Sequence, residues 1–100
     1  MNYHGVEISQ QALAEFCQRN RIRRLALFGS ILRDDFRLDS DVDVLVEFEP
    51  GSTPGLAFFT MEAELSNILG RKVDLNTPGF LSKYFRDEVL REAEVLYAAA

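Results

Sequence analysis

Hydrophobic positions along the chain switch between the spacing of a helix and the spacing of a strand. Behind Ser9, a typical N-cap residue, apolar side chains recur every three or four positions and predict a helix that fades near Asn20. Residues 22–28 end in the apolar run 25–28 and predict a buried strand. Residues 41–48 alternate between polar and apolar side chains, which indicates a strand with one buried face.

The rest of the chain continues the alternation of helices and strands. The predicted elements are a short helix capped by Ser30 and running to about Asp35, a turn at 49–55, a helix at 56–69 stopped by Gly70, a strand at 71–77, a helix at 80–93 that can break near Lys83, and a strand at 94–98. The Pro/Gly-rich turn is a candidate for a mobile loop that walls a site. The predicted fold class is α/β or α+β, a small mixed β-sheet packed with helices, and 100 residues fit one domain over 1–100.

Composition narrows the classes of protein to which the chain can belong. Hydrophobic residues make up 47% of the chain, which is normal for a globular protein, and the net charge is −5. A negative chain has no overall field that attracts a nucleic-acid backbone, so nucleic acid is not expected as a direct ligand. The single cysteine, Cys17, forms no internal disulfide and is expected in the core. Neither a membrane span nor a signal peptide is visible, so we expect a cytoplasmic protein.

Two carboxylates interrupt the strand predicted at 41–48. Because side chains alternate along a strand, Asp41 and Asp43 share one face, while the valines between and after them line the other, which is the core face. Two like charges so close raise each other's pKa unless a cation neutralises them. Mg²⁺ prefers oxygen ligands and completes its shell with substrate phosphates, so it fits this pair.

A third carboxylate, Asp74, interrupts the apolar strand predicted at 71–77. If this strand lies beside the first, the three acids converge around two Mg²⁺ ions that can activate a hydroxyl, clamp a triphosphate and stabilise an in-line displacement. Asp74 is then the natural general base for the attacking hydroxyl. An isolated Asp-x-Asp is more often a solvated start of a strand, and the third acid favours a metal site over that interpretation.

The turn at Gly29 and Ser30 offers a place for phosphates upstream of the acids. Glycine lets the backbone approach a phosphate closely, and a helix that starts at Ser30 presents a hydroxyl and amide groups to an anion. Arg33, one turn later, can point its guanidinium at phosphate oxygens or form a surface ion pair with Asp34 or Asp35. The residues alone leave both roles of Arg33 open.

Two further groups of side chains have a structural and a functional interpretation. Four arginines are interpreted as a solvated helix end and strand edge, in preference to a contact for RNA or an acidic partner: Arg19, Arg21, Arg23 and Arg24. Four phenylalanines are most simply core residues, although some can form a patch for a partner: Phe58, Phe59, Phe80 and Phe85. His4 is assigned no role in what we expect to be a loose terminus.

Gly-Ser at 29–30, followed after ten residues by Asp-Val-Asp at 41–43, resembles the signature of the DNA-polymerase-β-like nucleotidyltransferases. The run 27–48, the sequence around Asp74 and the closing Glu-Val-Leu-Tyr make nearly the whole chain similar to the minimal nucleotidyltransferases. The resemblance implies a polymerase-β-like fold and the following site residues. Nucleotide would be bound by Gly29, Ser30, Arg33 and Ser40, and the catalytic and metal-binding residues would be Asp41, Asp43 and Asp74. Many members carry Arg-Gly where this chain has Arg33 and Asp34, so its local backbone departs from the pattern.

The resemblance also implies a reaction and a partner. Members transfer a nucleoside monophosphate from a nucleoside triphosphate to a hydroxyl and release pyrophosphate. Larger relatives add a helical domain that holds the acceptor, whereas this chain ends soon after its third acid, so we expect the acceptor on another chain. For the minimal group, the resemblance implies an antitoxin that uses Mg²⁺ to transfer AMP from ATP to a tyrosine of a HEPN-type ribonuclease toxin. The toxin is expected to be encoded by the adjacent gene and to form a hetero-oligomer with this chain. The alternatives are a non-catalytic antitoxin that acts by binding, and transfer to RNA or a small molecule.

Overall fold

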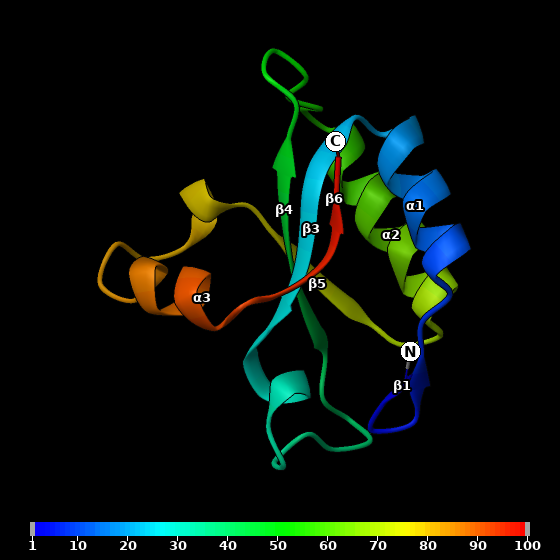
Figure 1. Cartoon of the computed structure of the whole chain (residues 1–100), viewed down its shortest axis with the longest axis vertical. Helices are drawn as coiled ribbons and strands as arrows, with labels where there is room; N and C mark the ends of the chain where they lie inside the picture. Colours follow the sequence, from blue (N-terminus) through cyan, green and yellow to red (C-terminus); the bar gives the residue numbers. More distant parts are fainter. Residues whose placement is uncertain (1, 100) are drawn as a thin grey trace.

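The computed structural model describes residues 2–99, which form a mixed sheet with helices on both sides (Figure 1). In chain order the elements are β1 (Asn2–Tyr3), β2 (Val6–Glu7), α1 (Gln10–Arg19), β3 (Ile22–Phe28), the 3₁₀ helix η1 (Gly29–Leu32), β4 (Val42–Phe48), α2 (Ala57–Leu69), β5 (Val73–Asn76), the 3₁₀ helix η2 (Pro78–Phe80), α3 (Arg86–Glu92) and β6 (Glu94–Ala98). The predicted mixture of helices and a small mixed sheet is confirmed. Within the described residues, no helix is long and apolar enough to cross a membrane.

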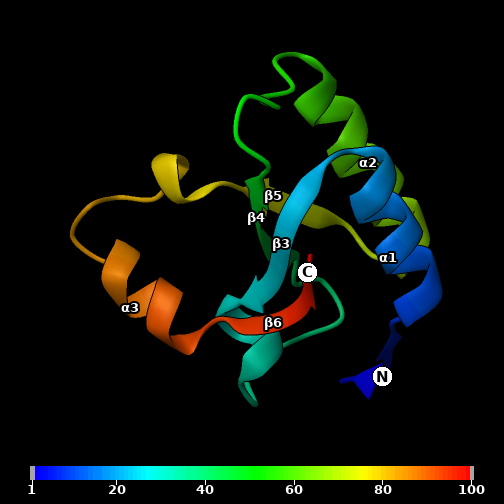
Figure 2. The same ribbon diagram turned by 45° about the horizontal axis from the view of Figure 1, so that its top comes forward.

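The main sheet has the strand order β5-β4-β3-β6. β4 is antiparallel to β3 and parallel to β5, and β6 is antiparallel to β3. Helices α1 and α2 lie together on one face, whereas η2 and α3 lie on the other side of the sheet (Figure 2). The β1–β2 hairpin forms a separate two-stranded sheet.

The core lies between the sheet and the pair α1 and α2. The three valines of β4 at 42, 44 and 46 are completely buried, which confirms the predicted core face. Ser9 caps α1 as predicted, since its Oγ accepts a hydrogen bond of 3.2 Å from the backbone N–H of Ala12. Gly70 ends α2 in the left-handed conformation, with φ +68°. Cys17 is fully buried in this core, also as predicted.

The outer edge of β5 is closed by side chains of α2. The backbone N–H of Leu75 donates to Oε2 of Glu62 at 2.8 Å, and the N–H of Val73 donates to Oγ of Ser66 at 3.0 Å. Two outward amides of this edge strand are therefore satisfied by the helix that covers it, so β5 is held by β4 on one side and by α2 on the other.

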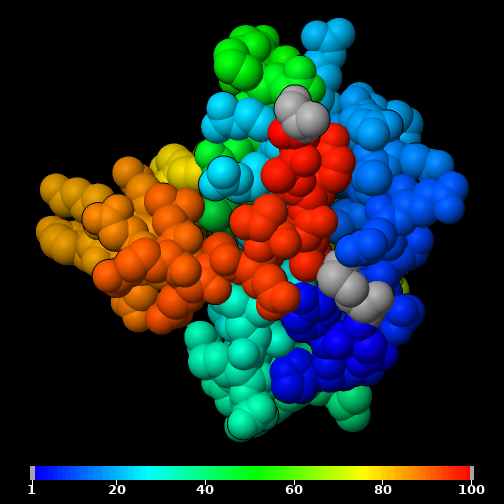
Figure 3. All heavy atoms as spheres, in the orientation of Figure 1, coloured from blue at the N-terminus to red at the C-terminus, as the bar shows by residue number. Residues whose placement is uncertain are grey.

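The helix predicted over 80–93 is broken near Lys83, as the sequence indicated, and only its second half is a regular helix. Residues 78–80 form a 3₁₀ turn, and a regular helix begins only at Arg86. Ser82 accounts for the interruption, because its Oγ accepts from the N–H of Tyr84 at 3.3 Å, a local bond that competes with a helix. The segment 78–93 stands out as a yellow-to-orange lobe beside the sheet (Figure 3).

Three of the four phenylalanines expected in the core lie outside it. Only Phe58 is buried, whereas Phe59 and Phe80 are each 67% exposed and Phe85 is 49% exposed. Phe80 and Phe85 flank the break in the predicted helix, and Phe59 follows Phe58 on the outward side of α2. The core interpretation is therefore confirmed for Phe58 alone.

Two shorter predictions are also corrected. The helix expected from Ser30 to Asp35 is a 3₁₀ helix that ends at Leu32, and its N-cap is Phe28, so Ser30 is not a cap. The N-terminal segment is not loose: β1 and β2 pair across a turn at His4 and Gly5, both of which have positive φ. Such conformations are invisible to hydrophobic periodicity, because they depend on backbone angles at single residues.

Candidate active site

Two of the predicted acids lie side by side on neighbouring strands. Asp43 of β4 is in register with Asp74 of the parallel strand β5, so both side chains leave the same face of the sheet. Neighbouring strands are about 4.8 Å apart, which brings the two carboxyl groups within reach of one cation. This face is turned away from the core and from α1 and α2, because the alternate residues of β4 are the buried valines.

Asp43 is the inner of these two carboxylates. It is half-buried, whereas Asp74 is exposed. Burial, and after it the charges of Asp74 and Asp41, raise the pKa of Asp43 to about 6, while the guanidinium of Arg33 acts in the opposite direction. Asp41, Asp74 and Arg33 therefore all lie close enough to Asp43 to influence its charge.

Gly29 provides the space that Asp43 occupies. It follows directly after Phe28, the residue of β3 that pairs with Asp43, and its φ is +78°. A Cβ atom at Gly29 would overlap Oδ2 of Asp43 and lie 3.1 Å from its Cγ. The backbone angle and the lack of space both require glycine here, so the Gly-Ser turn and the acid strand are parts of one packed unit.

Asp41 lies just before β4, and 43% of its side chain is exposed. Its Oδ2 is 3.9 Å from Nζ of Lys72, and both side chains are substantially exposed. A surface ion pair of this length holds its partners weakly. Lys72 was not among the predicted site residues, and its ordinary place after a helix end gave no signal for the contact.

The donor set suits a hard cation such as Mg²⁺, because Asp41, Asp43 and Asp74 offer only carboxylate oxygens. A divalent ion would also offset the repulsion that contributes to the raised pKa of Asp43. Among residues 2–99, no three His, Cys, Asp or Glu side chains are already gathered as a metal cluster. An ion held by all three carboxylates would therefore require their side chains to turn toward it.

The predicted nucleotide-binding residues beside Gly29 are engaged in different ways. Ser30 lies half-buried in η1. Arg33 follows η1 with its Nε 3.4 Å from Oδ1 of Asp35, so the structure contains the surface ion pair that was one of its two interpretations. The hydroxyl of Ser40 accepts a hydrogen bond of 2.9 Å from the backbone N–H of Arg37, which shapes the loop before β4.

Arg71 secures the same loop from outside. Its Nη2 donates to the carbonyl oxygens of Arg37 at 2.9 Å and Ser40 at 2.7 Å, and its Cζ lies 4.7 Å from the centroid of the Phe36 ring. These contacts fix the residue directly before Asp41. The sequence gives no signal for them, since the carbonyls that Arg71 binds lie more than thirty residues away.

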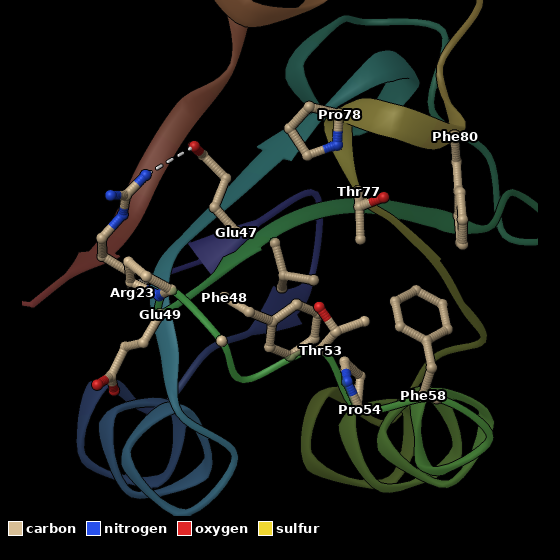
Figure 4. A pocket seen from close by; sticks show the side chains of 14 residues that line it. Arg23, Glu47, Phe48, Glu49, Thr53, Pro54, Phe58, Thr77, Pro78 and Phe80 are labelled. Carbon is tan, nitrogen blue, oxygen red and sulfur yellow. Dashed lines mark hydrogen bonds and ion pairs between the residues drawn. The ribbon is translucent and has the colours of Figure 1, made fainter.

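A pocket of about 530 Å³ opens at the far end of β4 (Figure 4). All residues of 49–55 except Ser52 line it, which confirms that the Pro/Gly-rich turn borders a cavity. The other walls are the end of β4, the start of α2 and η2. The side chains that shape it are the rings of Phe48, Phe58 and Phe80, the hydroxyls of Thr53 and Thr77, and the ion pair of Arg23 with Glu47.

Known proteins share both the sequence pattern and this architecture. Residues 9–96 match the nucleotidyltransferase domain family. The chain is 39% identical over 79 residues to the protein adenylyltransferase MntA of Thermococcus cleftensis, a match that covers 78% of each chain. It is similar in structure to a protein provisionally assigned as a minimal nucleotidyltransferase, with a TM-score of 0.70 and 38% identity over 84% of this chain and 85% of that one. It shares the fold of a chain in the complex of tri-AMPylated Shewanella oneidensis HEPN toxin with MNT antitoxin, with a TM-score of 0.64 and 20% identity over 90% and 70% of the two chains.

The matched region contains every residue of the site described above. Gly29 at the end of β3, the acid pair at the start of β4 and Asp74 on β5 all fall within residues 9–96. The resemblance inferred from the Gly-Ser and Asp-x-Asp spacing is therefore confirmed at the level of the family and of the fold. The chain belongs to the nucleotidyltransferase family and is an enzyme of the minimal nucleotidyltransferase type.

Proposed function

We propose that this nucleotidyltransferase is the antitoxin of a toxin–antitoxin pair. In this proposal it transfers AMP from ATP to a tyrosine hydroxyl of a HEPN ribonuclease toxin encoded by the adjacent gene, and so neutralises the toxin. The observation that carries the proposal is the pairing of half-buried Asp43 with exposed Asp74 beside the Gly29 turn. The adenylyltransferase relative and the AMPylated HEPN toxin in complex with its antitoxin support the choice of nucleotide and partner.

The three acids have different roles in metal binding and proton transfer, which follow from how exposed each one is. Asp41 and Asp43, with Asp74, would hold Mg²⁺, which when bound supplies positive charge to the triphosphate and to the leaving pyrophosphate. Asp74 is open to solvent and so accessible to a hydroxyl from another chain. Asp74 takes the hydroxyl proton as the acceptor oxygen bonds to the α-phosphorus and the bond from that phosphorus to pyrophosphate breaks.

The test is a transfer assay with the purified partner. The protein is incubated with Mg²⁺, ATP labelled on its α-phosphate and the product of the adjacent gene, and label on the toxin is measured together with its ribonuclease activity. We expect label on the toxin and loss of its activity with the unsubstituted protein, and neither with Asp43→Asn or Asp74→Asn. Asp39→Asn is the matched control, because it makes the same charge change at an exposed position in the loop before β4.

Two outcomes would reject the proposal. If both acid variants label the toxin as well as the unsubstituted protein does, the acids are not the catalytic groups. If the toxin is never labelled but is still silenced by both acid variants, the protein acts as a non-catalytic binding antitoxin. Labelling of RNA or of a small molecule in place of the toxin would identify another acceptor.

A further inference from the structure

The pocket lies at the opposite end of β4 from the acids and the Gly-Ser turn. β3 and β4 are antiparallel, so η1 leaves the sheet at the Asp43 end of β4, away from Glu47. Asp43 and Glu47 share one face of β4 and are about 13 Å apart along it. The turn and the acids therefore lie together at one end of β4 and the pocket lies at the other end, so a nucleotide with its phosphates at the acids can extend along the strand and place its base in the pocket.

The lining of the pocket fits a neutral, flat ring. Its walls carry the rings of Phe48, Phe58 and Phe80. The ring centroids of Phe48 and Phe58 are 6.4 Å apart, and those of Phe58 and Phe80 are 5.4 Å apart. Phe80 is 67% exposed, so one side of its ring is free to stack on a ligand. The hydroxyls of Thr53 and Thr77 can donate or accept a hydrogen bond at the edge of such a ring (Figure 4).

The charged residues at the rim, Arg23, Glu47 and Glu49, do not call for an anionic ligand, because the exposed Glu49 leaves the rim with a negative charge. Arg23 Nη2 lies 3.3 Å from Oε1 of Glu47, so the two side chains already neutralise each other. The cavity volume of about 530 Å³ lies within the range of about 300–1,000 Å³ that is usual for small-molecule sites.

We propose that this pocket, formed by Phe48, Phe58, Phe80, Thr53 and Thr77, binds the base of the nucleoside triphosphate substrate, with Phe80 as the stacking residue. The proposal rests on the proposed function, because it assumes that the phosphates lie at the acids. The residues that line the pocket are then the determinants of base preference, which neither the acids nor Gly29 can provide.

The distance from Asp74 favours a base over an aromatic side chain of the partner. Thr77, the residue directly after β5, follows Asp74 by three residues, which corresponds to about 10 Å of extended chain. An acceptor hydroxyl must come within about 3 Å of the carboxylate that takes its proton. A tyrosine ring inside the pocket would hold its hydroxyl away from Asp74, whereas a base in the pocket is joined to the reacting phosphate through its sugar.

Calorimetric titration in the presence of Mg²⁺ tests the proposal with two probes. ATP carries a base, and inorganic tripolyphosphate carries only the phosphate chain. Phe80→Ala is expected to weaken ATP binding about tenfold, as for the loss of one base–aromatic stack, and to leave tripolyphosphate binding unchanged. Phe59→Ala is the matched control, since Phe59 is equally exposed at 67% but lies outside the pocket, and it should change neither.

The possible results separate this proposal from the proposed function. Unchanged ATP affinity in Phe80→Ala overturns the assignment of the base, and if the same variant raises the KM for the toxin, the pocket receives the partner instead. Equal weakening of both probes overturns it as well, because the effect would then not depend on the base. If the unsubstituted protein binds neither ATP nor tripolyphosphate, the proposed function itself fails.

Discussion

Asp43→Asn is expected to stabilise the folded protein while it removes the centre of the site. Asparagine keeps the shape that fits beside Gly29 but carries no charge. In the native protein, burial and the neighbouring acids raise the pKa of Asp43 to about 6 from the ordinary value of 3.8. The native state therefore binds this proton more tightly than the unfolded chain does, and stability falls as the pH rises from about 4 to about 6.

The size of the effect follows from that difference in pKa. Taken in full it corresponds to about 3 kcal/mol. Because Asp43 is only half-buried, solvent screening reduces the figure to about 1 kcal/mol. For a domain of this size the variant should melt about 4–8 °C higher than the unsubstituted protein at pH 7.

Thermal unfolding followed by circular dichroism, without Mg²⁺ and at several pH values, checks this reasoning. The gap between variant and unsubstituted protein should be near zero below pH 4 and reach its full size above pH 6. Mg²⁺ should narrow the gap, because it stabilises the state that binds it. The exposed control Asp39→Asn should melt close to the unsubstituted protein. A variant that melts lower than the unsubstituted protein at pH 7, or a gap independent of pH, would refute the reasoning.

Three further predictions concern residues around the site and in the core. Gly29→Ala should lower the free energy of unfolding in urea by clearly more than about 1 kcal/mol, because its methyl group meets Asp43. Gly51→Ala has the same positive φ but open space around it, so it should lower the free energy of unfolding by only about 1 kcal/mol. Equal losses in the two variants would contradict this. Arg71→Ala should lower the free energy of unfolding by about 2 kcal/mol, because two hydrogen bonds from its guanidinium are lost. It should also speed hydrogen exchange of the backbone amides of residues 36–41. Unchanged exchange would contradict the role of Arg71 in holding that loop. Burial raises the pKa of the Cys17 thiol to about 12, so a thiol reagent should modify it only in proportion to the unfolded fraction, and rapid modification of the native protein would show that the core opens there.

The acid strand could be predicted because its signal is local. The period of two in residues 41–48 separates the acid face from the valine face without reference to any other segment. The position of Asp74 beside Asp43 depends on which strands pair and in which register. From the sequence, the three acids could be expected to converge only if the two strands were neighbours. Arg71 was missed for the same reason, since its charge is ordinary at a helix end and its ligands are carbonyls of a distant loop.

The C-terminal third shows where periodicity misleads. Residues 80–93 have the apolar spacing of a helix, but the hydroxyl of Ser82 bonds to a nearby amide and the regular helix starts later. Phe80 and Phe85 lie on either side of that interruption, and both rings are exposed. A pattern that counts hydrophobic positions places such residues in the core, because it takes their spacing as that of one packed helix.

The bonds from Glu62 and Ser66 to the amides of β5 bear on how this protein behaves at high concentration. An edge strand with free amides can recruit a strand from another molecule and start aggregation. Here two of the amides that would form such a contact are already bonded within the chain. The strand that carries Asp74 can thus keep this carboxylate open to solvent without offering a template for self-association, and substitutions at Glu62 should first be noticed as a loss of solubility.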